Sequence, residues 1–320
     1  MRKSLIKDDV LAEISRGKTV SGGMLSSKLG VSRTAVWKAV NALRAEGYFI
    51  SGLGGGYVLA PENRRLCGEQ LSAVTGENIV FFEKTVSTNE EIKSLAERGE
   101  KEFTVAVARA QSGGKGRQGR KFYSPEGGLY FSILLRPALS PADCLKITTA
   151  AAVSMCEAIE AVAKKDCKIK WVNDIFIKDK KVCGILTEGV LDGESGGLKY
   201  AVLGVGLNVS LPNGGFNSAI EDAADSLFQS GSVPSLIYCA LLDNFIKSFK
   251  KYYKDIGNMP HLESYKKRSY LDGKTVTYVK GGKAHTATAC GISEKGELIV
   301  KEKGKEILLS SGEVRVSGYE

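Results

Sequence analysis

The sequence predicts an α+β protein in three parts, and three observations predict it. The chain has 320 residues, which is more than one compact core accommodates. In its middle, short β-rich runs alternate with helices, and several runs are joined by hairpins, a pattern typical of a mixed sheet. Helices dominate before this region, and short strands with glycine turns follow it. The expected domains are residues 1–62, 66–265 and 266–320.

Composition sets the class of protein. Hydrophobic residues make up 43% and charged residues 25% of the chain, as in an ordinary globular protein. No apolar run reaches the roughly 20 residues of a membrane span, and the stretch from Met1 to Asp9 lacks the apolar core of a signal peptide. We therefore expect a cytoplasmic protein without membrane association. The net charge of +9 suits an anionic partner, although a solvated basic surface is the alternative.

Cysteine and histidine usage excludes several kinds of site. The seven cysteines are scattered and form no Cys-x-x-Cys pair, so reduced thiols are expected rather than a zinc site or a disulfide scaffold. The two histidines, His261 and His285, are too few to indicate a histidine metal site or a catalytic triad.

The first domain is predicted to be a helix-turn-helix unit. Apolar residues recur every four positions from Ile6 through Val10 to Ile14, which describes one buried helix face. A second helix begins at Gly22 and runs to Leu29, and a third follows a glycine turn with Ser32 as its N-cap. Two short helices joined in this way form the DNA-binding motif.

The outer face of the third helix suits DNA. It presents hydrogen-bond donors and cations that fit a major groove and its phosphates. The expected DNA contacts are Gly22, Ser32, Arg33, Thr34, Trp37, Lys38 and Asn41. A hairpin from Tyr48 to Leu59, with a glycine-rich tip, reads as the wing of a winged helix. A small helical docking domain is the alternative, and residues 61–65 are interpreted as a linker.

The central domain is expected to hold a mixed sheet. The expected strands are Ile79–Glu83, Thr104–Ala110, Leu129–Leu135, Ile169–Trp171, Ile175–Lys178, Val182–Glu188 and Tyr200–Val209. The expected helices are Asn89–Arg98, Cys144–Ala163 and Val233–Tyr253, the last with Leu236, Ala240, Leu241 and Phe245 on its apolar face.

The segment from Gln111 to Lys121, Gln-Ser-Gly-Gly-Lys-Gly-Arg-Gln-Gly-Arg-Lys, is the most informative. Its glycines let backbone amides approach an anion, and its cations suit a polyphosphate. Residues 114–119 match Gly-x-Gly-x-x-Gly, but a loop follows where a dinucleotide fold needs a helix. Gly116 follows Lys115, so the segment is not a P-loop either. A flexible surface loop is the alternative interpretation.

Two further segments carry polar groups in suggestive places. Ser87-Thr88-Asn89 follows a strand and opens a helix, where an ordinary capping box with Glu90 is the alternative. Lys170-Trp171-Val172-Asn173-Asp174 precedes a hairpin that carries Lys181. The Asn-Asp pair could bind hydroxyls or orient a cation, and an inward lysine could hold a carboxylate.

The order and spacing of these segments resemble those of the biotin protein ligases. Gly204-x-Gly206-x-Asn208-Val209 and Ala224-Asp225-Ser226-Leu227 also fit that family. The resemblance covers essentially the whole chain and matches the bifunctional bacterial form, a ligase that is also a biotin-responsive repressor. Related lipoyl ligases lack the arginine-glycine loop. Three positions depart from the family's usual residues, with Val172 for proline, Gln118 for arginine and Phe122 for tryptophan.

The resemblance implies an architecture and partners. The central domain would be class II synthetase-like. The strands expected at Lys274–Tyr278, Thr286–Cys290, Leu298–Lys301 and Glu306–Leu309 would form an SH3-like barrel, with structural support and partner docking as its roles. The substrates would be ATP and biotin, with Mg²⁺. The partners would be a biotin carboxyl carrier protein and operator DNA, bound by a homodimer that pairs its central sheets through a strand such as Tyr200–Val209.

The resemblance also implies the site residues. Lys181 and Arg117 would be catalytic, and Asp174 is the candidate metal contact. Biotin would contact Ser87, Thr88, Asn89, Gln111, Lys115, Gly116, Arg117 and Lys181. ATP would contact Arg117, Arg120, Phe122, Asn173 and Asn208. Two other functions remain open: a ligand-sensing transcription factor with an inactive ligase core, and a lipoyl or other acyl ligase with a regulatory head.

Overall fold

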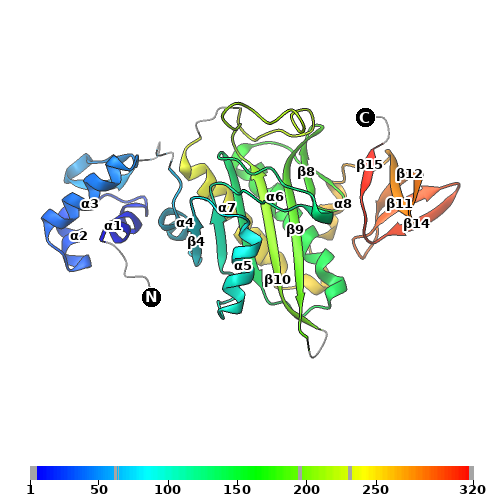
Figure 1. Cartoon of the computed structure of the whole chain (residues 1–320), viewed down its shortest axis with the longest axis horizontal. Coiled ribbons are helices and arrows are strands. Elements are labelled where there is room, and N and C mark those ends of the chain that lie inside the picture. The colour runs from blue at the N-terminus through cyan, green and yellow to red at the C-terminus, as the bar shows by residue number, and fades with distance from the viewer. Residues whose placement is uncertain (1–5, 61–62, 64, 194–196, 230–232, 317–320) are drawn as a thin grey trace.

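The computed structural model describes residues 6–60, 63, 65–193, 197–229 and 233–316. Three bodies follow one another along the long axis (Figure 1): a helical head in blue, a central sheet in cyan to green, and a C-terminal sheet in orange and red. None of the described helices is long and apolar enough to cross a bilayer.

The head is a helix-turn-helix with a small wing, as the sequence predicts. Its elements are α1 (Ile6–Ile14), β1 (Val20–Ser21), α2 (Gly22–Leu29), α3 (Arg33–Ala45), β2 (Ile50–Ser51), the 3-10 turn Leu53–Gly55 and β3 (Gly56–Leu59). The side chains of Ser21 and Ser32 accept hydrogen bonds from the backbone of the first turns of α2 and α3. The strands form an antiparallel sheet in the order β1-β3-β2. Ile6 was expected on the buried face of α1 with Val10 and Ile14. This was wrong, because Ile6 is 42% exposed.

Asn63, in the segment interpreted as a linker, connects the head to the central domain. Residues 61, 62 and 64 lie outside the described part, but Asn63 is fully buried. Its Nδ2 donates to Ser235 Oγ at 2.9 Å, and its Oδ1 accepts from the backbone N–H of Phe49 at 3.2 Å. The side chain therefore joins the wing to the central domain. An unexpected helix, α4 (Gly68–Thr75), follows and packs on α7 (Ser235–Tyr253).

The central sheet has seven strands in the order β4-β5-β6-β10-β9-β8-β7. The strands are β4 (Ile79–Phe82), β5 (Val105–Ala108), β6 (Gly128–Leu135), β7 (Lys168–Lys170), β8 (Asp174–Ile177), β9 (Lys180–Leu191) and β10 (Leu198–Asn208). Only β4 and β5 pair in parallel; the other pairs are antiparallel, so the sheet is mixed as expected. Because β10 is hydrogen-bonded on both edges, it cannot be the edge through which two sheets pair. The expectation that two copies of the chain pair their central sheets through Tyr200–Val209 was therefore wrong.

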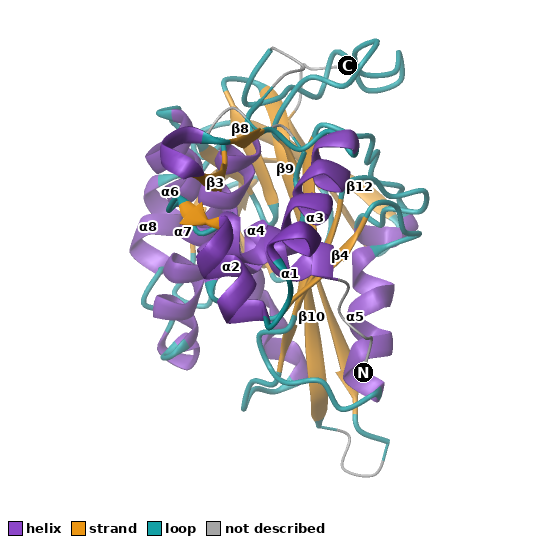
Figure 2. Cartoon of the chain, turned by 90° about the vertical axis from the view of Figure 1, so that its left-hand side faces the viewer, coloured by secondary structure: helices purple, strands orange, loops and turns teal. Residues whose placement is uncertain are grey.

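Helices cover both faces of this sheet (Figure 2). On one face α6 (Cys144–Ala163) and α7 pack against each other, and α6 packs on β9. On the other face α5 (Thr88–Glu97) buries Ile92 and Ala96 against Ala106, Leu134 and Val202. Leu236 of α7 is 39% exposed, so it does not belong to the buried face expected for it. Packing places the N-terminus of α5 directly above β6 and β10.

The C-terminal sheet has five strands in the order β14-β13-β12-β11-β15. They are β11 (Thr275–Lys280), β12 (Lys283–Ile292), β13 (Leu298–Glu302), β14 (Lys305–Leu309) and β15 (Val314–Val316). A short helix, α8 (Leu262–Lys267), precedes them. The apolar core is continuous with that of the central domain, and Trp171 Nε1 donates to the carbonyl of Gly296 at 3.0 Å. The turn between β12 and β13 is thereby held against the central domain.

A buried histidine makes the fold sensitive to acid. His261 is fully buried, and its Nε2 lies 2.8 Å from Thr149 Oγ1, while Nδ1 has no partner among the described residues. Burial lowers the pKa of His261 to about 4. The unfolded chain binds a proton near pH 6.5 and the folded chain does not, so the free energy of unfolding should fall as the pH drops from 6.5 to 4. The loss should be on the order of 3 kcal/mol.

Urea unfolding across this pH range measures the effect. The variant His261→Gln cannot titrate there, and its stability should depend less steeply on pH than that of the wild type. Equal slopes for the two proteins would show that His261 is not the group responsible.

Candidate active site

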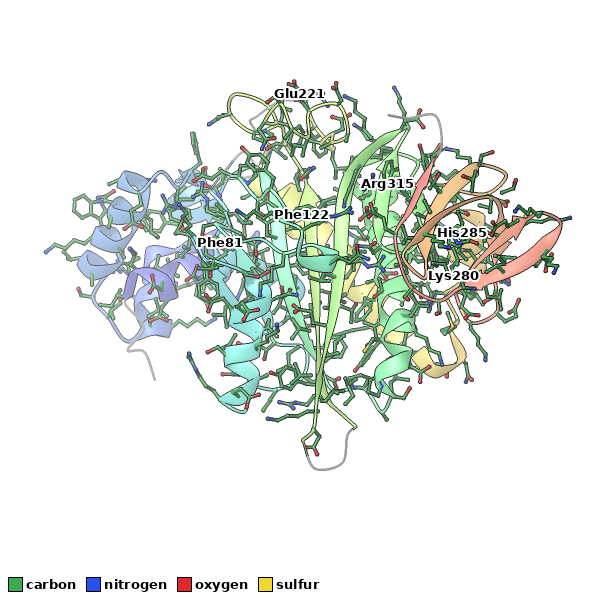
Figure 3. All side chains as sticks on the ribbon, turned by 45° about the vertical axis from the view of Figure 1, so that its right-hand side comes forward. Phe81, Phe122, Glu221, Lys280, His285 and Arg315 are labelled. Atoms are coloured by element: carbon green, nitrogen blue, oxygen red, sulfur yellow. The ribbon has the colours of Figure 1, made fainter. Side chains whose placement is uncertain are left out.

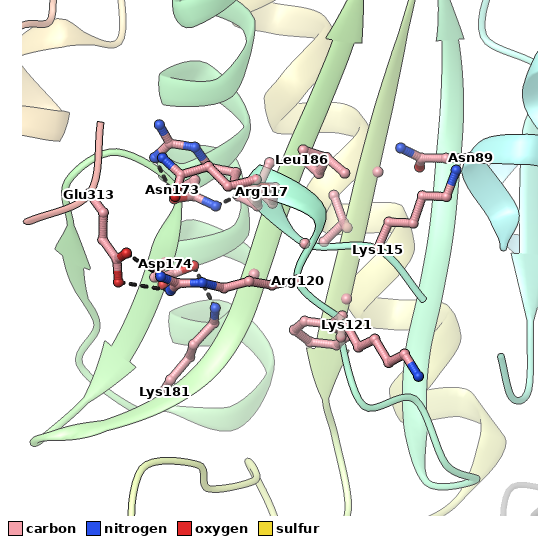
Figure 4. A pocket seen from close by; sticks show the side chains of 18 of the residues that line it. Asn89, Lys115, Arg117, Arg120, Lys121, Asn173, Asp174, Lys181, Leu186 and Glu313 are labelled. Atoms are coloured by element: carbon pink, nitrogen blue, oxygen red, sulfur yellow. Dashed lines mark hydrogen bonds and ion pairs between the residues drawn. The ribbon is translucent and has the colours of Figure 1, made fainter. Parts of the chain in front are cut away.

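A pocket of about 170 Å³ opens on the face of the central sheet below the N-terminus of α5. Its floor comes from β9 and β10, one wall from the glycine loop 111–121, and its far rim from residues 312–314 of the C-terminal part. Phe122 lies near the middle of the molecule in Figure 3. Figure 4 shows Asn89 and Lys115 at one end of the pocket and Asp174, Lys181 and Glu313 at the other. The pocket is therefore elongated, with chemically different ends.

Glycines make room on the floor of the pocket. Gly184 of β9 pairs with Gly206 of β10, and Leu186 pairs with Gly204. A Cβ at Gly184 or Gly206 would collide with the ring of Phe122, and one at Gly204 would collide with the amide of Asn89. The two pocket walls thus approach the sheet as closely as backbone permits, which accounts for small residues at these positions.

The first end of the pocket is polar, and the charge of Lys115 there is balanced by its ion pair with Glu90. Ser87, Thr88 and Asn89 are buried at the start of α5. Gln111 Oε1 accepts from the backbone N–H of Thr88 at 2.8 Å, and its Nε2 donates to Ser124 Oγ at 3.0 Å. Such a set of fixed amides and hydroxyls suits a neutral ligand group with its own donors and acceptors.

The second end is cationic. Lys181 Nζ lies 2.7 Å from Asp174 Oδ1, an ion pair without hydrogen-bond geometry, because that buried oxygen accepts no hydrogen bond from the described residues. Arg117 donates to Asn173 Oδ1 at 3.3 Å and to the carbonyl of Gly312 at 3.1 Å. Burial lowers the pKa of Lys170, although Asp174 opposes that shift. Together with Arg120, these side chains place four cations at this end among the described residues.

Ion pairs hold the glycine loop 111–121 across the pocket. Arg120 forms a bidentate ion pair with Glu313, and the hydrogen bonds of Arg120 hold the pKa of the Glu313 carboxyl below its usual value. Lys115 Nζ donates to Glu90 of α5 at 2.7 Å. Within the 3-10 turn Arg117–Gly119, Gln118 has a φ of 55°. Residues distant in sequence thus hold the loop at two points, and Figure 4 shows one of them, the pair of Arg120 with Glu313.

Most site residues expected from the sequence meet in this pocket. Its lining includes Ser87, Thr88, Asn89, Gln111, Lys115, Gly116, Arg117, Arg120, Phe122, Asn173, Asp174 and Lys181. Asn208 is placed elsewhere: it ends β10, outside the lining, and its Nδ2 donates to the carbonyl of Asp225 at 3.0 Å. The sequence interpretation missed Lys170 and Leu186, and it assigned no site role to Gly312–Val314.

The head presents the face expected to contact DNA. On α3 the residues Val36, Ala39, Val40 and Leu43 are buried, and the opposite face carries Ser32, Arg33, Thr34, Trp37 and Lys38, all exposed. The Trp37 side chain is 56% exposed. Gly22 and Asn41 are half-buried beside this face. A large aromatic group and two cations on one exposed helix face are consistent with a nucleic-acid partner.

Comparisons with known proteins give the family. Residues 81–208 match the Biotin/lipoate A/B protein ligase family, and residues 7–58 match a helix-turn-helix domain. The bifunctional ligase/repressor BirA of Bacillus spizizenii is 34% identical over 263 residues, which is 80% of each chain. The chain belongs to the bifunctional ligase/repressor family. The Escherichia coli member is 27% identical over 95% of each chain.

A solved relative supports the same conclusion for the fold. The structure of biotin protein ligase from Aquifex aeolicus in complex with biotin and ATP aligns with a TM-score of 0.62 and 26% identity, covering 75% of this chain and 99% of that one. The central sheet is therefore biotin ligase-like, and the family resemblance predicted from the sequence is confirmed. The range matched to the ligase family includes most of the pocket, while Gly312–Val314 lie beyond it.

Proposed function

We propose that this chain is an ATP-dependent biotin ligase whose head represses transcription in response to biotin. In the first step the biotin carboxylate attacks the α-phosphate of ATP, giving biotinyl-5′-AMP and pyrophosphate. In the second, a lysine amine of a biotin carboxyl carrier protein attacks the anhydride carbonyl and AMP leaves. The observation that carries this proposal is the single pocket with a neutral polar end and a cationic end in a chain of this family.

The neutral end would hold the ureido ring. Ser87, Thr88, Asn89 and Gln111 supply hydroxyl and amide groups there. Lys115 and Gly116 of the glycine loop would close over the ligand, and Lys181 would pair with the carboxylate. Lys181 is held near the floor by Asp174 and lies 5.7 Å from the Phe122 ring centroid. The flexible Lys181 side chain can exchange the Asp174 carboxylate for the carboxylate of biotin.

The cationic end would stabilise the transferring phosphate. Attack by one anion on another requires positive charge where negative charge develops. Arg117, Arg120 and Lys181 supply it, and Arg117 and Lys181 are the residues that we propose to be catalytic. Phe122 would cover the adenine above the paired glycines, with Asn173 as a further contact. Asn208 is the weakest ATP contact of the set, since its amide already bonds to Asp225.

Asp174 is the residue that we propose to hold Mg²⁺. No cluster of three potential metal ligands exists among the described residues, which fits a magnesium ion bound by one carboxylate and substrate phosphates. The buried Oδ1 of Asp174 accepts no hydrogen bond from the described residues, and it would become available as a ligand once Lys181, now 2.7 Å away, turns to the biotin carboxylate. The ion would supply charge neutralisation for the leaving pyrophosphate.

The remaining proposals concern assembly. We place the domains at residues 1–62, 66–265 and 266–320, with a class II synthetase-like centre and an SH3-like C-terminal barrel. Operator DNA would bind α3 and the wing of each head in a homodimer, because one small head contacts few phosphates. A protein that uses ATP and DNA in this way would work in the cytoplasm.

Pyrophosphate release tests the catalytic proposal. The protein should release pyrophosphate from ATP when biotin is added, and lipoate should neither replace biotin nor compete with it. Release with lipoate would favour a lipoyl ligase. Biotin binding without any release would favour a ligand sensor with an inactive core.

The glycine loop should become harder to digest when the site is filled. Trypsin is expected to cut near Lys115–Lys121 in the free protein, and biotin with ATP should slow that cleavage, because the adenylate adds contacts to a loop whose ion pairs to Glu90 and Glu313 are exposed and therefore weak. Cleavage in the C-terminal hairpin at Lys280–Lys283 provides the internal control. Equal protection at both places, or at neither, would contradict closure of the loop.

A further inference from the structure

Glu188 lies next to the neutral end of the pocket without lining it. It follows Gly184 and Leu186 on the same face of β9, and its side chain is 27% exposed. Its Oε2 accepts from Asn89 Nδ2 at 2.5 Å, and its Oε1 lies 2.9 Å from Lys93 Nζ. The proposed mechanism gives this carboxylate no role.

The carboxylate fixes which way the Asn89 amide faces. An ionised carboxylate accepts hydrogen bonds and cannot donate them, so the NH₂ group of Asn89 must point at Glu188. The amide oxygen is then turned toward Ser132, whose Oγ lies 2.6 Å away. If the amide were reversed, two acceptors would face each other at the Glu188 contact.

The orientation of the Asn89 amide constrains the hydrogen bonds of two neighbouring hydroxyl groups, those of Ser132 and Thr88. Ser132 Oγ is fully buried and lies 2.7 Å from Thr88 Oγ1 as well. A hydroxyl has one hydrogen, and Ser132 uses it on the Asn89 oxygen. The Thr88 hydroxyl can then donate only to Ser132 Oγ, at 2.7 Å, or to Gln111 Oε1, at 3.1 Å, and either choice leaves a lone pair of Thr88 Oγ1 for a ligand. Gln111 remains satisfied, because it accepts from the Thr88 backbone N–H.

From this network we infer that Glu188 is a positioning residue that sets the donor and acceptor pattern of the neutral end and so selects a cyclic urea. Asn89 keeps one amide hydrogen for the urea oxygen, and Thr88 keeps one lone pair for a urea N–H. A dithiolane ring such as that of lipoate offers neither partner. This inference rests on the proposed biotin ligase function.

A chain of ion pairs connects Glu188 with the glycine loop. Lys93 also donates to Glu90 at 3.0 Å. Burial lowers the pKa of Lys93, but its hydrogen bonds to Glu188 and Glu90 outweigh burial and raise it. Glu90 in turn pairs with Lys115 of the glycine loop. Loss of Lys93 would weaken this chain but leave the bond between Glu188 and Asn89.

Three variants separate orientation from charge. Glu188→Met removes the acceptor and should raise the KM for biotin roughly 10- to 100-fold in the pyrophosphate assay, with the KM for ATP and kcat nearly unchanged. Glu188→Gln retains an amide oxygen that can accept from Asn89, and should restore most of the biotin affinity. Lys93→Met removes only the ion-pair partner, and should leave the KM for biotin close to that of the wild type.

The outcomes distinguish the explanations. The preference for biotin over lipoate should shrink in Glu188→Met alone. Equal damage from the methionine and glutamine substitutions, or from Lys93→Met, would overturn the inference and assign Glu188 a charge or packing role. A parallel loss in kcat and in the KM for ATP would overturn it too. If the wild-type protein releases no pyrophosphate with biotin, the proposed function fails instead.

Discussion

Replacing Lys181 with alanine is expected to lower the rate of biotin adenylation roughly 30- to 4000-fold, which corresponds to about 2–5 kcal/mol. Lys181 lies at the cationic end of the pocket, where it pairs with Asp174. Its loss would leave the biotin carboxylate without a partner beside the triphosphate, and would leave the half-buried Asp174 without its ion-pair partner. Both effects oppose the approach of one anion to another.

Lys180 provides the matched control. It is the adjacent lysine on β9, but it is exposed and bonds to the carbonyl of Glu221 outside the pocket. Lys180→Ala should therefore adenylate biotin at nearly the wild-type rate. Similar rates for Lys181→Ala and wild type would remove Lys181 from the site, and similar losses in both variants would point to a folding defect.

Operator binding is expected to depend strongly on ligand and on salt. Binding should tighten roughly 5- to 150-fold when biotin and ATP are present, because the adenylate can shift a monomer–dimer equilibrium only as far as it prefers the dimer. Affinity should also fall steeply with salt, since the contacts are largely to phosphates. Arg33→Ala and Lys38→Ala should weaken the DNA complex while leaving pyrophosphate release unchanged, because α3 lies far from the pocket (Figure 1).

The head offers its own control for this experiment. Lys7 lies on α1 and pairs with Glu46 at 2.6 Å, away from the exposed face of α3. Lys7→Ala should bind the operator nearly as the wild type does. Equal operator affinity with and without adenylate, across concentrations that span monomer and dimer, would contradict regulation by the ligand.

Local patterns in the sequence were sufficient for most of the architecture. Apolar periodicity marked the long helix Cys144–Ala163 with its bounds, and the serine before α3 marked that helix start. The glycine loop and the Ser87–Asn89 turn were recognisable because backbone approach to an anion and helix capping impose residue types at fixed spacing. The residues that specify features of this kind lie within a few positions of one another in the sequence.

Features that depend on distant contacts could not be predicted in the same way. Gly312–Val314 reach the pocket only because the C-terminal sheet packs on the central core. Asn63 looked like part of a polar linker, and its burial against Ser235 follows from how the head docks. Glu188 reads as an ordinary strand residue until the fold places it against Asn89. The pairing of β10 on both edges likewise depends on sheet order, which no local pattern specifies.

ATP labelled on its α-phosphate gives the most direct test of the central claim, that one pocket joins biotin to AMP. The labelled ATP would be mixed with biotin, Mg²⁺ and an excess of the protein, and the products would be separated after one turnover. The label should appear in protein-bound biotinyl-5′-AMP, and it should pass to free AMP when a carrier protein is added. Label that stays in ATP, or that reaches AMP without biotin, would contradict the account.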